Sequence, residues 1–452
     1  MPHSAPPDFD RDRYARHVAG VAATWREAML NAGFDAAVIP AGASAYRFQD
    51  DLAPPFRANP NFAQWAPLAQ AEHGVLLYRP PHRPRLFFYQ PADFWHLPPA
   101  VPEWAEAEFD LEVHPELTDL AEAVFGHLKD GERTVLVGEA GAADGNAPFD
   151  AVNPPDLVDA LHYARARKDD FELDAMRRAT ELGVRGHLAA RDAYFDGASE
   201  LDIHLAFLRA SRQTEAELPY PNIVAQNTHA GVLHYQLYDA APPGLRRSFL
   251  IDAGGRYLGY ASDITRTYSA ARDAFADLVD ALDAAQRALI DEVQPGVTYP
   301  HLHERMHRVV ARLLHEFGLV SCSPDAAFES GITDAFFPHG LGHLLGLQTH
   351  DVGGHLADAH GTPAPPPERF PALRLTRTVE AGHVFTVEPG IYFIPLLLDP
   401  LRVEAAGADV VWSRVDEFLP CGGIRIEDNV AVTADGTENL TRDAFARLER
   451  HA

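Results

Sequence analysis

The stretch FLIDAGGRYLGYASDITRTYS, residues 249–269, carries two aspartates in a pattern that predicts a β-hairpin. Asp252 closes an apolar run, and Asp263 follows eleven residues later. A hairpin that turns near Gly254 and Gly259 would set the two carboxylates opposite one another on one face. Two unpaired carboxylates at that separation repel, and a bound cation removes this cost. Taken alone, the stretch leaves open that both are solvated turn residues.

Two glutamates further along the chain interrupt apolar, strand-like runs. Glu388 lies in VFTVEPGIYFI, and Glu427 lies in GGIRIEDNVAV close to Arg425. A lone charge in a buried strand is costly, so each glutamate predicts an ion pair or a metal ligand. For Glu427, an ion pair with Arg425 remains the alternative.

The third part of the pattern is FFPHGLGHLLGLQTHDVGG, residues 336–354. It supplies His339, His343 and His350 among glycines that let the backbone approach closely. Four carboxylates and a nearby histidine favour a metal over ion pairs. An oxygen-rich donor set suits two hard or borderline ions such as Mn²⁺.

A competing motif is HERMH, residues 303–307, which fits the H-E-x-x-H signature of zinc endopeptidases. The apolar spacing over residues 300–317 predicts an ordinary amphipathic helix instead. The extended zinc pattern fails, because Val310 and Leu313 occupy its glycine and histidine places. Glu329, a substitute third ligand, lies in a loop-like stretch. The motif is therefore incomplete, and we expect a core-packing helix.

The composition is that of a globular protein with more than one domain. The chain has 452 residues, too many for one core. The formal net charge of -27 argues against nucleic acid and anionic membranes as partners. The two cysteines, Cys322 and Cys421, form no disulfide framework. With no signal-peptide pattern and no run of 18 apolar residues, these features predict a cytoplasmic protein that does not span a membrane.

The chain predicts two domains, residues 1–160 and 161–452, with a boundary near the proline and charged residues of 153–170. The first reads as α/β, and its strand-like runs are 34–42, 73–80, 83–91 and 133–141. The second mixes antiparallel-looking strands with two long helices, about 273–293 and 300–317, which predicts an α+β catalytic domain.

At this point the sequence resembles a known family. Asp252, Asp263, His343, Glu388 and Glu427 match, in order and local context, the five ligands of the pita-bread metallopeptidases. That family includes methionine aminopeptidase, aminopeptidase P and prolidase. The resemblance covers nearly the whole chain and is nearest to bacterial prolidase, the Xaa-Pro dipeptidase, and the organophosphorus acid anhydrolases. It is carried by FQDDLAPPFRANPNFAQW, FYQPADFWH, LPYPNIVAQNTHAGVLHY, LRLTRTVEAGHVFTVEPGIYFI and GGIRIEDN.

The resemblance implies a pita-bread (creatinase/aminopeptidase-like) catalytic domain of the α+β class and a smaller creatinase-like α/β domain that dimerises and caps the site. It implies hydrolysis of dipeptides with a C-terminal proline by a hydroxide bridging two divalent metals, expected as Mn²⁺, with Co²⁺ or Zn²⁺ as alternatives. Asp252 and Glu427 would bridge both metals, Asp263 would bind one, and His343 with Glu388 would bind the other.

The resemblance also assigns roles around the substrate. The implied catalytic residues are His234, His350 and Glu388, with Glu388 shuttling a proton. The implied substrate-binding residues are Tyr220, His234, His339, Arg374 and Arg425. Clamping the free proline carboxylate with His234 and Arg374 would explain selection of dipeptides. From the residues alone, Tyr220 as plain core and Arg374 as a solvated loop residue remain open.

Several alternatives follow from the same family. Aminopeptidase P activity differs only in cleaving Xaa-Pro-Xaa chains, and organophosphate hydrolysis is a conceivable side activity. A metal-free relative acting as a binding protein is a different class, but such members have lost ligands that this chain keeps. Thr349 stands where relatives carry Val, which makes the pocket wall more polar. The family also implies a homodimer in which FQDD and Trp95 approach the partner's site.

Overall fold

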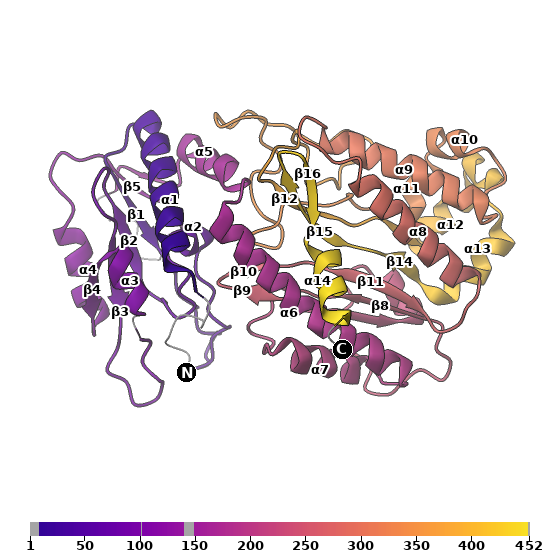
Figure 1. Ribbon diagram of the computed structural model, residues 1–452, viewed down its shortest axis with the longest axis horizontal. Coiled ribbons are helices and arrows are strands. Elements are labelled where there is room, and N and C mark those ends of the chain that lie inside the picture. The colour runs from indigo at the N-terminus through magenta and orange to yellow at the C-terminus, as the bar shows by residue number, and fades with distance from the viewer. Residues whose placement is uncertain (1–8, 101, 140–148, 451–452) are drawn as a thin grey trace. The chain divides into compact units, whose positions relative to one another are not determined.

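The computed structural model describes residues 9–100, 102–139 and 149–450 (Figure 1). Contacts divide the chain into two compact units. The first contains the described residues up to Arg165, with Asp169–Phe171 and Asp358–Thr362. The second contains Ala166–Lys168, Glu172–Ala357 and the residues from Pro363 onward. No helix in the described part of the chain is long and apolar enough to cross a bilayer.

The first unit is built on one six-stranded sheet in the order β4-β3-β2-β1-β5-β6. Its strands are β1 (Ala36–Pro40), β2 (Val75–Tyr78), β3 (Arg85–Tyr89), β4 (Asp110–His114), β5 (Thr134–Leu136) and β6 (Ala151–Val152). Its helices are α1 (Arg11–Ala32), α2 (Pro60–Trp65), α3 (Glu103–Glu108), α4 (Leu117–Gly126) and α5 (Pro155–Arg165). Each of the four predicted apolar runs contains a strand. Strand β4 was not predicted, because the sequence DLEVH at the sheet edge has little apolar character.

The second unit combines antiparallel strands with long helices, which confirms the predicted α+β class. Its helices are α6 (Asp170–Phe195), α7 (Glu200–Ser211), α8 (Ala274–Ile290), α9 (Tyr299–Glu316), α10 (Pro324–Glu329), α11 (Ile332–Phe336), α12 (Pro395–Val403), α13 (Trp412–Phe418) and α14 (Leu440–Glu449). Three short 3₁₀ segments are η2 (Asn227–Gly231), η3 (Ala405–Asp409) and η4 (Leu419–Cys421). The two long predicted helices correspond to α8 and α9.

The strands of this unit form small sheets that meet around one region. They are β7 (Ile223–Gln226), β8 (Ser248–Asp252), β9 (Arg256–Tyr257), β10 (Tyr260–Ala261), β11 (Thr265–Ser269), β12 (Val384–Val387), β13 (Gly390–Tyr392), β14 (Gly423–Arg425), β15 (Asp428–Thr433) and β16 (Gly436–Asn439). Their orders are β11-β8-β7, β12-β15-β16, β13-β14 and β10-β9. Helix α8 packs on β11, α14 packs on β15, and α9 packs on α8 (Figure 1). A bridge between Thr265 and Glu427 joins the first sheet to the strands from the end of the chain.

Candidate metal centre

The two aspartates of the opening hairpin share a face but do not lie directly opposite one another. In the β8–β11 register, Asp252 pairs with Thr265, and Asp263 comes two residues before that position. The predicted direct opposition is therefore wrong by two residues. The loop is tighter than a simple hairpin, since a side chain on Gly254 would meet the carbonyl oxygen of Ser262 at 1.9 Å. Because side chains alternate along a strand, a shift of two residues keeps both carboxylates on one face.

The two glutamates lie at breaks between strands, not inside them. Glu388 follows the end of β12 and precedes β13, while Glu427 lies between β14 and β15. The prediction of strand positions was thus wrong in detail. Pro389 has no N–H to continue the strand ladder, which explains the first break. At the second, the backbone N–H of Glu427 donates to Thr265 of the neighbouring sheet.

These breaks bring the carboxylates to one buried histidine. Ligand atoms of Asp263, His343 and Glu427 all lie within 4.8 Å of one another, and all three residues are buried. The Nε2 atom of His343 lies 3.4 Å from Asp263 Oδ2 and 3.6 Å from Glu388 Oε1. Asp263, Glu388 and Glu427 therefore lie around the imidazole of His343, and Asp252 belongs to the same cavity.

The hydrogen bonding of His343 fits a metal ligand. Its Nδ1 lies 2.9 Å from the carbonyl oxygen of Leu344 and must donate to it. In the neutral ring this leaves the lone pair on Nε2, as in histidines that bind metals. When no cation is bound, burial acts to lower the pKa of His343, but the hydrogen bond to Asp263 outweighs it and raises the pKa, which favours a proton on Nε2 instead. A lone pair aimed at carboxylate oxygens is repulsive unless a proton or a cation lies between them. The donor set therefore fits divalent metal, held by Asp252, Asp263, His343, Glu388 and Glu427.

The pKa values of the carboxyl groups also favour a bound cation. Burial raises the pKa of Asp252 to about 6 and that of Glu388 to about 7, and it raises the pKa of Glu427 well above its usual range. For Asp263, burial acts in the same direction, but the hydrogen bond and charge of His343 outweigh it and lower the pKa. Charged carboxylates are thus penalised here, and a bound cation would relieve the penalty.

Two side chains donate hydrogen bonds to the carboxylate of Asp252. The hydroxyl of Tyr220 lies 2.8 Å from Asp252 Oδ1 and also contacts Asp263. The guanidinium of Arg425 donates to Asp252 Oδ2 at 2.7 Å. Tyr220 is therefore not plain core. The direct carboxylate partner of Arg425 is Asp252, so the alternative that paired it with Glu427 is wrong.

The site opens into a cavity of about 190 Å³ in the second unit. It is lined by Leu233, His234, Asp252, Asp263, His339, Gly340, Gly342, His343, His350, Ala372, Arg374, Glu388, Arg425 and Glu427. Every predicted site residue except Tyr220 is on this wall, and Tyr220 reaches the site through Asp252. Among the described residues, none hydrogen-bonds or ion-pairs with the side chains of His234 and Arg374, both of which belong to exposed residues. They are free to bind a ligand.

Three supporting hydroxyl groups were not predicted from the sequence. Thr265 donates to Glu427 at 2.7 Å, and Thr386 lies 3.4 Å from Glu388. Tyr392 is hydrogen-bonded to both His339 and Arg425, at 2.8 and 2.9 Å. Of the three, only Thr265 could have been predicted from the sequence, because the two-residue period of DITRT places it on the same face as Asp263.

The helix that carries HERMH is a packing helix, as expected. His303 and His307 are each 1% exposed, and both rings contact Phe370, with centroids 4.5 and 4.6 Å away. Glu304 bonds Arg308 one turn along. The described residues contain no group of three ligand atoms that includes either histidine. Glu329 ends helix α10, so its placement in a loop was wrong, and its nearest cation is again Arg308.

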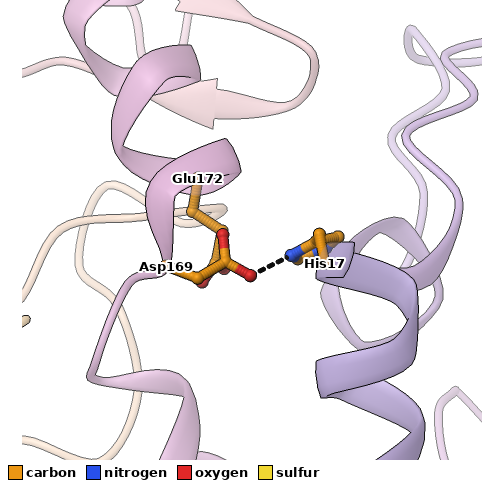
Figure 2. A group of neighbouring side chains, drawn as sticks. All are labelled: His17, Asp169 and Glu172. Carbon is orange, nitrogen blue, oxygen red and sulfur yellow. Dashed lines mark hydrogen bonds and ion pairs between the residues drawn. The ribbon is translucent and has the colours of Figure 1, made fainter. Parts of the chain in front are cut away.

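Two other groups combine histidine with carboxylates. His17 Nδ1 contacts the carboxylate of Asp169 (Figure 2), and this distance is 2.6 Å. His17 Nε2 lies 2.7 Å from the carbonyl oxygen of Gln64. Both ring nitrogens are thus paired within the protein, one with a carboxylate and one with a backbone carbonyl oxygen. In the other group, formed by Glu200, His229 and Asp239, the carboxylate of Glu200 is satisfied by four hydrogen bonds within the protein.

Comparisons with known proteins agree with this geometry. A family model described as Metallopeptidase family M24 matches residues 174–434, and one described as Xaa-Pro dipeptidase, N-terminal domain, matches residues 12–163. The chain is 44% identical over 439 residues to Xaa-Pro dipeptidase 2 of Idiomarina loihiensis, covering 96% of this chain and 99% of that protein. It is 46% identical over 437 residues to an Xaa-Pro dipeptidase of Xanthomonas campestris pv. campestris, covering 96% and 98%. The structure of Pseudomonas aeruginosa aminopeptidase PepP matches with a TM-score of 0.73 at 24% identity, covering 96% of this chain and 99% of that one, which shows a shared fold.

Proposed function

Because the chain belongs to metallopeptidase family M24, we propose that it is an Xaa-Pro dipeptidase, a metal-dependent hydrolase of dipeptides with a C-terminal proline. Relatives with that name, about 45% identical over nearly their whole length, support the activity. The observation that carries the proposal is the composition of one cavity. Four carboxylates and a histidine lie on one wall, and the free guanidinium of Arg374 belongs to the same cavity.

The acidic wall would hold two divalent ions through Asp252, Asp263, His343, Glu388 and Glu427. When bound, such ions supply Lewis acidity, which activates a water molecule and offsets negative charge on the substrate carbonyl oxygen. We propose Mn²⁺, because four of the five ligands are carboxylates and hard oxygen donors suit that ion.

Around this centre, Glu388 is proposed to transfer a proton, and His350 is proposed to donate a hydrogen bond. Glu388 lies on the cavity wall beside His343, and its carboxylate is proposed to take up and return a proton during the reaction. It would accept the proton of the attacking water and deliver it to the proline nitrogen as the bond breaks. Burial lowers the pKa of His350 to about 4, so its ring is neutral and can donate one N–H to the carbonyl oxygen.

The carboxylate of the substrate is proposed to bind Arg374 and His234. The other guanidinium on the cavity wall, that of Arg425, is already paired with Asp252. A free C-terminal carboxylate close to the scissile bond exists in a dipeptide and is absent at that place in a longer chain. Charge-assisted hydrogen bonds therefore favour dipeptides.

The domain boundary and the assembly are further proposals. We place the two domains at residues 1–160 and 161–452, and the family match over residues 12–163 supports a separate first domain. That domain is proposed to cap the site and to mediate a homodimer, and the protein is proposed to act in the cytoplasm. The net charge of -27 disfavours nucleic acid as a partner.

The deciding experiment compares substrates of two lengths. Protein loaded with Mn²⁺ should cleave Xaa-Pro dipeptides and leave Xaa-Pro-Xaa tripeptides intact, and metal analysis should find about two ions per chain. Cleavage of tripeptides at comparable rates would assign the chain to aminopeptidase P instead, a name carried by one of its structural neighbours. Dipeptide turnover that survives complete removal of metal would refute the proposed chemistry.

A further inference from the structure

The segment that carries His234 into the cavity is the connection between β7 and β8. It leaves β7 at Gln226, turns through η2, and passes Leu233 and His234 before reaching Asp239. His234 itself is exposed, and no described residue bonds its imidazole. The position of this ring therefore depends on how firmly the backbone on either side of it is held.

One buried carboxylate holds that segment through two backbone N–H groups and two side chains. Glu200, 1% exposed, begins helix α7. Its Oε1 accepts from the backbone N–H of Gln226 at 2.7 Å and from Nδ1 of His229 at 2.8 Å. Its Oε2 accepts from the hydroxyl of Tyr235 and from the backbone N–H of Asp239, both at 2.9 Å.

These four bonds match the capacity of the group. An ionised carboxylate accepts at about four lone-pair sites and donates at none, so each of the four partners must donate. The donors come from both ends of the segment and from the residue next to His234. The first turn of α7 also favours a negative charge at this place. The carboxylate of Glu200 thus joins both ends of the segment and closes it into a loop.

We propose that Glu200 is a positioning residue for substrate recognition. By fixing residues 226–239, it sets where His234 stands and so how well the C-terminal carboxylate of the substrate is bound. This inference rests on the proposed dipeptidase function and deepens it. Glu200 touches no reacting atom, and it acts through His234.

The substitution Glu200→Gln tests the proposal with almost no change in size. A glutamine offers one carbonyl oxygen and one NH₂ group. On one side of the side chain, its NH₂ group would therefore face an N–H donor of the loop. We expect KM for an Xaa-Pro dipeptide to rise about 10-fold, with kcat changed less than about 3-fold, because ground-state binding is what is lost. Hydrogen exchange should accelerate at the amides of Gln226 and Asp239. Tyr235→Phe, which removes one bond of four, should give a smaller rise in KM.

The matched control is Asp202→Asn on the same helix. Asp202 is exposed, and within the described part of the chain its side chain bonds Ser199 Oγ alone and makes no hydrogen bond to the segment. This variant should keep the wild-type KM and the wild-type exchange of Gln226. If it reproduces the effects of Glu200→Gln, the role of Glu200 is general support of α7 and the proposal fails.

Two further comparisons separate recognition from simple loss of structure. The rise in KM should vanish for the Xaa-proline amide, which lacks the carboxylate, and should add nothing in a His234→Ala background. An equal rise for dipeptide and amide would overturn the proposal. Wild-type protein that does not cleave Xaa-Pro dipeptides would refute the proposed function instead. In that event, hydrogen exchange would still report whether Glu200 holds the loop.

Discussion

Loading the metal-free protein with Mn²⁺ at pH 6 should release more than one proton per chain. The free carboxyl groups at the cavity bind protons because no cation offsets their burial, and a metal ligand must give its proton up. With a pKa of about 7, Glu388 is about 90% protonated at pH 6, and with a pKa of about 6, Asp252 is about half protonated. These two groups alone release about 1.4 protons, and Glu427 adds to that number, since burial raises its pKa as well.

The pH dependence follows from the direction of these shifts. Both pKa values lie above those of ordinary carboxyl groups, so the protonated fraction grows as pH falls and metal must compete with it. At pH 8 the release from Glu388 and Asp252 should fall to about 0.1 proton. The apparent affinity for Mn²⁺ should therefore weaken steeply between pH 8 and pH 6.

Isothermal titration calorimetry measures this directly. Titrating Mn²⁺ in two buffers of different ionisation enthalpy gives the number of protons released at each pH. Glu388→Gln should reduce the release at pH 6, whereas Glu304→Gln on the HERMH helix should leave it unchanged. A release at pH 6 no larger than at pH 8 would refute the reasoning, since it would mean that the carboxylates stay charged without a cation.

Two other substitutions test the remaining parts of the site. Arg374→Ala should raise KM for Xaa-Pro dipeptides about 10- to 100-fold, the worth of a charge-assisted hydrogen bond, and leave turnover of the Xaa-proline amide unchanged; an equal effect on both substrates would argue against a carboxylate clamp. His303→Ala should keep the bound metal and dipeptidase activity within about 3-fold, while the free energy of unfolding measured in urea falls by about 2 kcal/mol through lost packing against Phe370. Loss of metal together with activity in that variant would instead revive a zinc site at HERMH.

The side chains gathered at the cavity were predictable because buried charge is conspicuous in a sequence. Glu388 and Glu427 interrupt apolar runs, and such positions are tolerated only beside a compensating group. HERMH was set aside on other grounds, because the apolar spacing over residues 300–317 predicts a packing helix and no third ligand completes the motif. In the structure, Glu304 indeed pairs with Arg308 at the surface of α9.

The register and the strand breaks were not predictable in the same way. A two-residue period fixes which face a side chain occupies, but it does not fix the offset between paired strands. Asp263 could therefore be assigned to the face of Asp252 and still be placed two residues from its true position. The role of Tyr392 was hidden for a related reason. Its hydroxyl joins His339 to Arg425 across separate elements, and nothing local in the sequence marks that contact.

The division of charge within the cavity explains why one small site can recognise a carboxylate beside a cluster of carboxylates. Arg425 is buried and forms an ion pair with Asp252. Because this pair offsets the charge of the guanidinium, Arg425 does not attract the substrate. Arg374 has no such partner among the described residues, and its guanidinium remains available. If Arg425 were also free, the substrate carboxylate could bind beside the metal ligands and compete with the peptide carbonyl for that position. In the proposed binding mode, the pairing of Arg425 with Asp252 leaves Arg374 and His234 to take the carboxylate, and the anchoring of His234 through Glu200 would complete the selection of one binding direction.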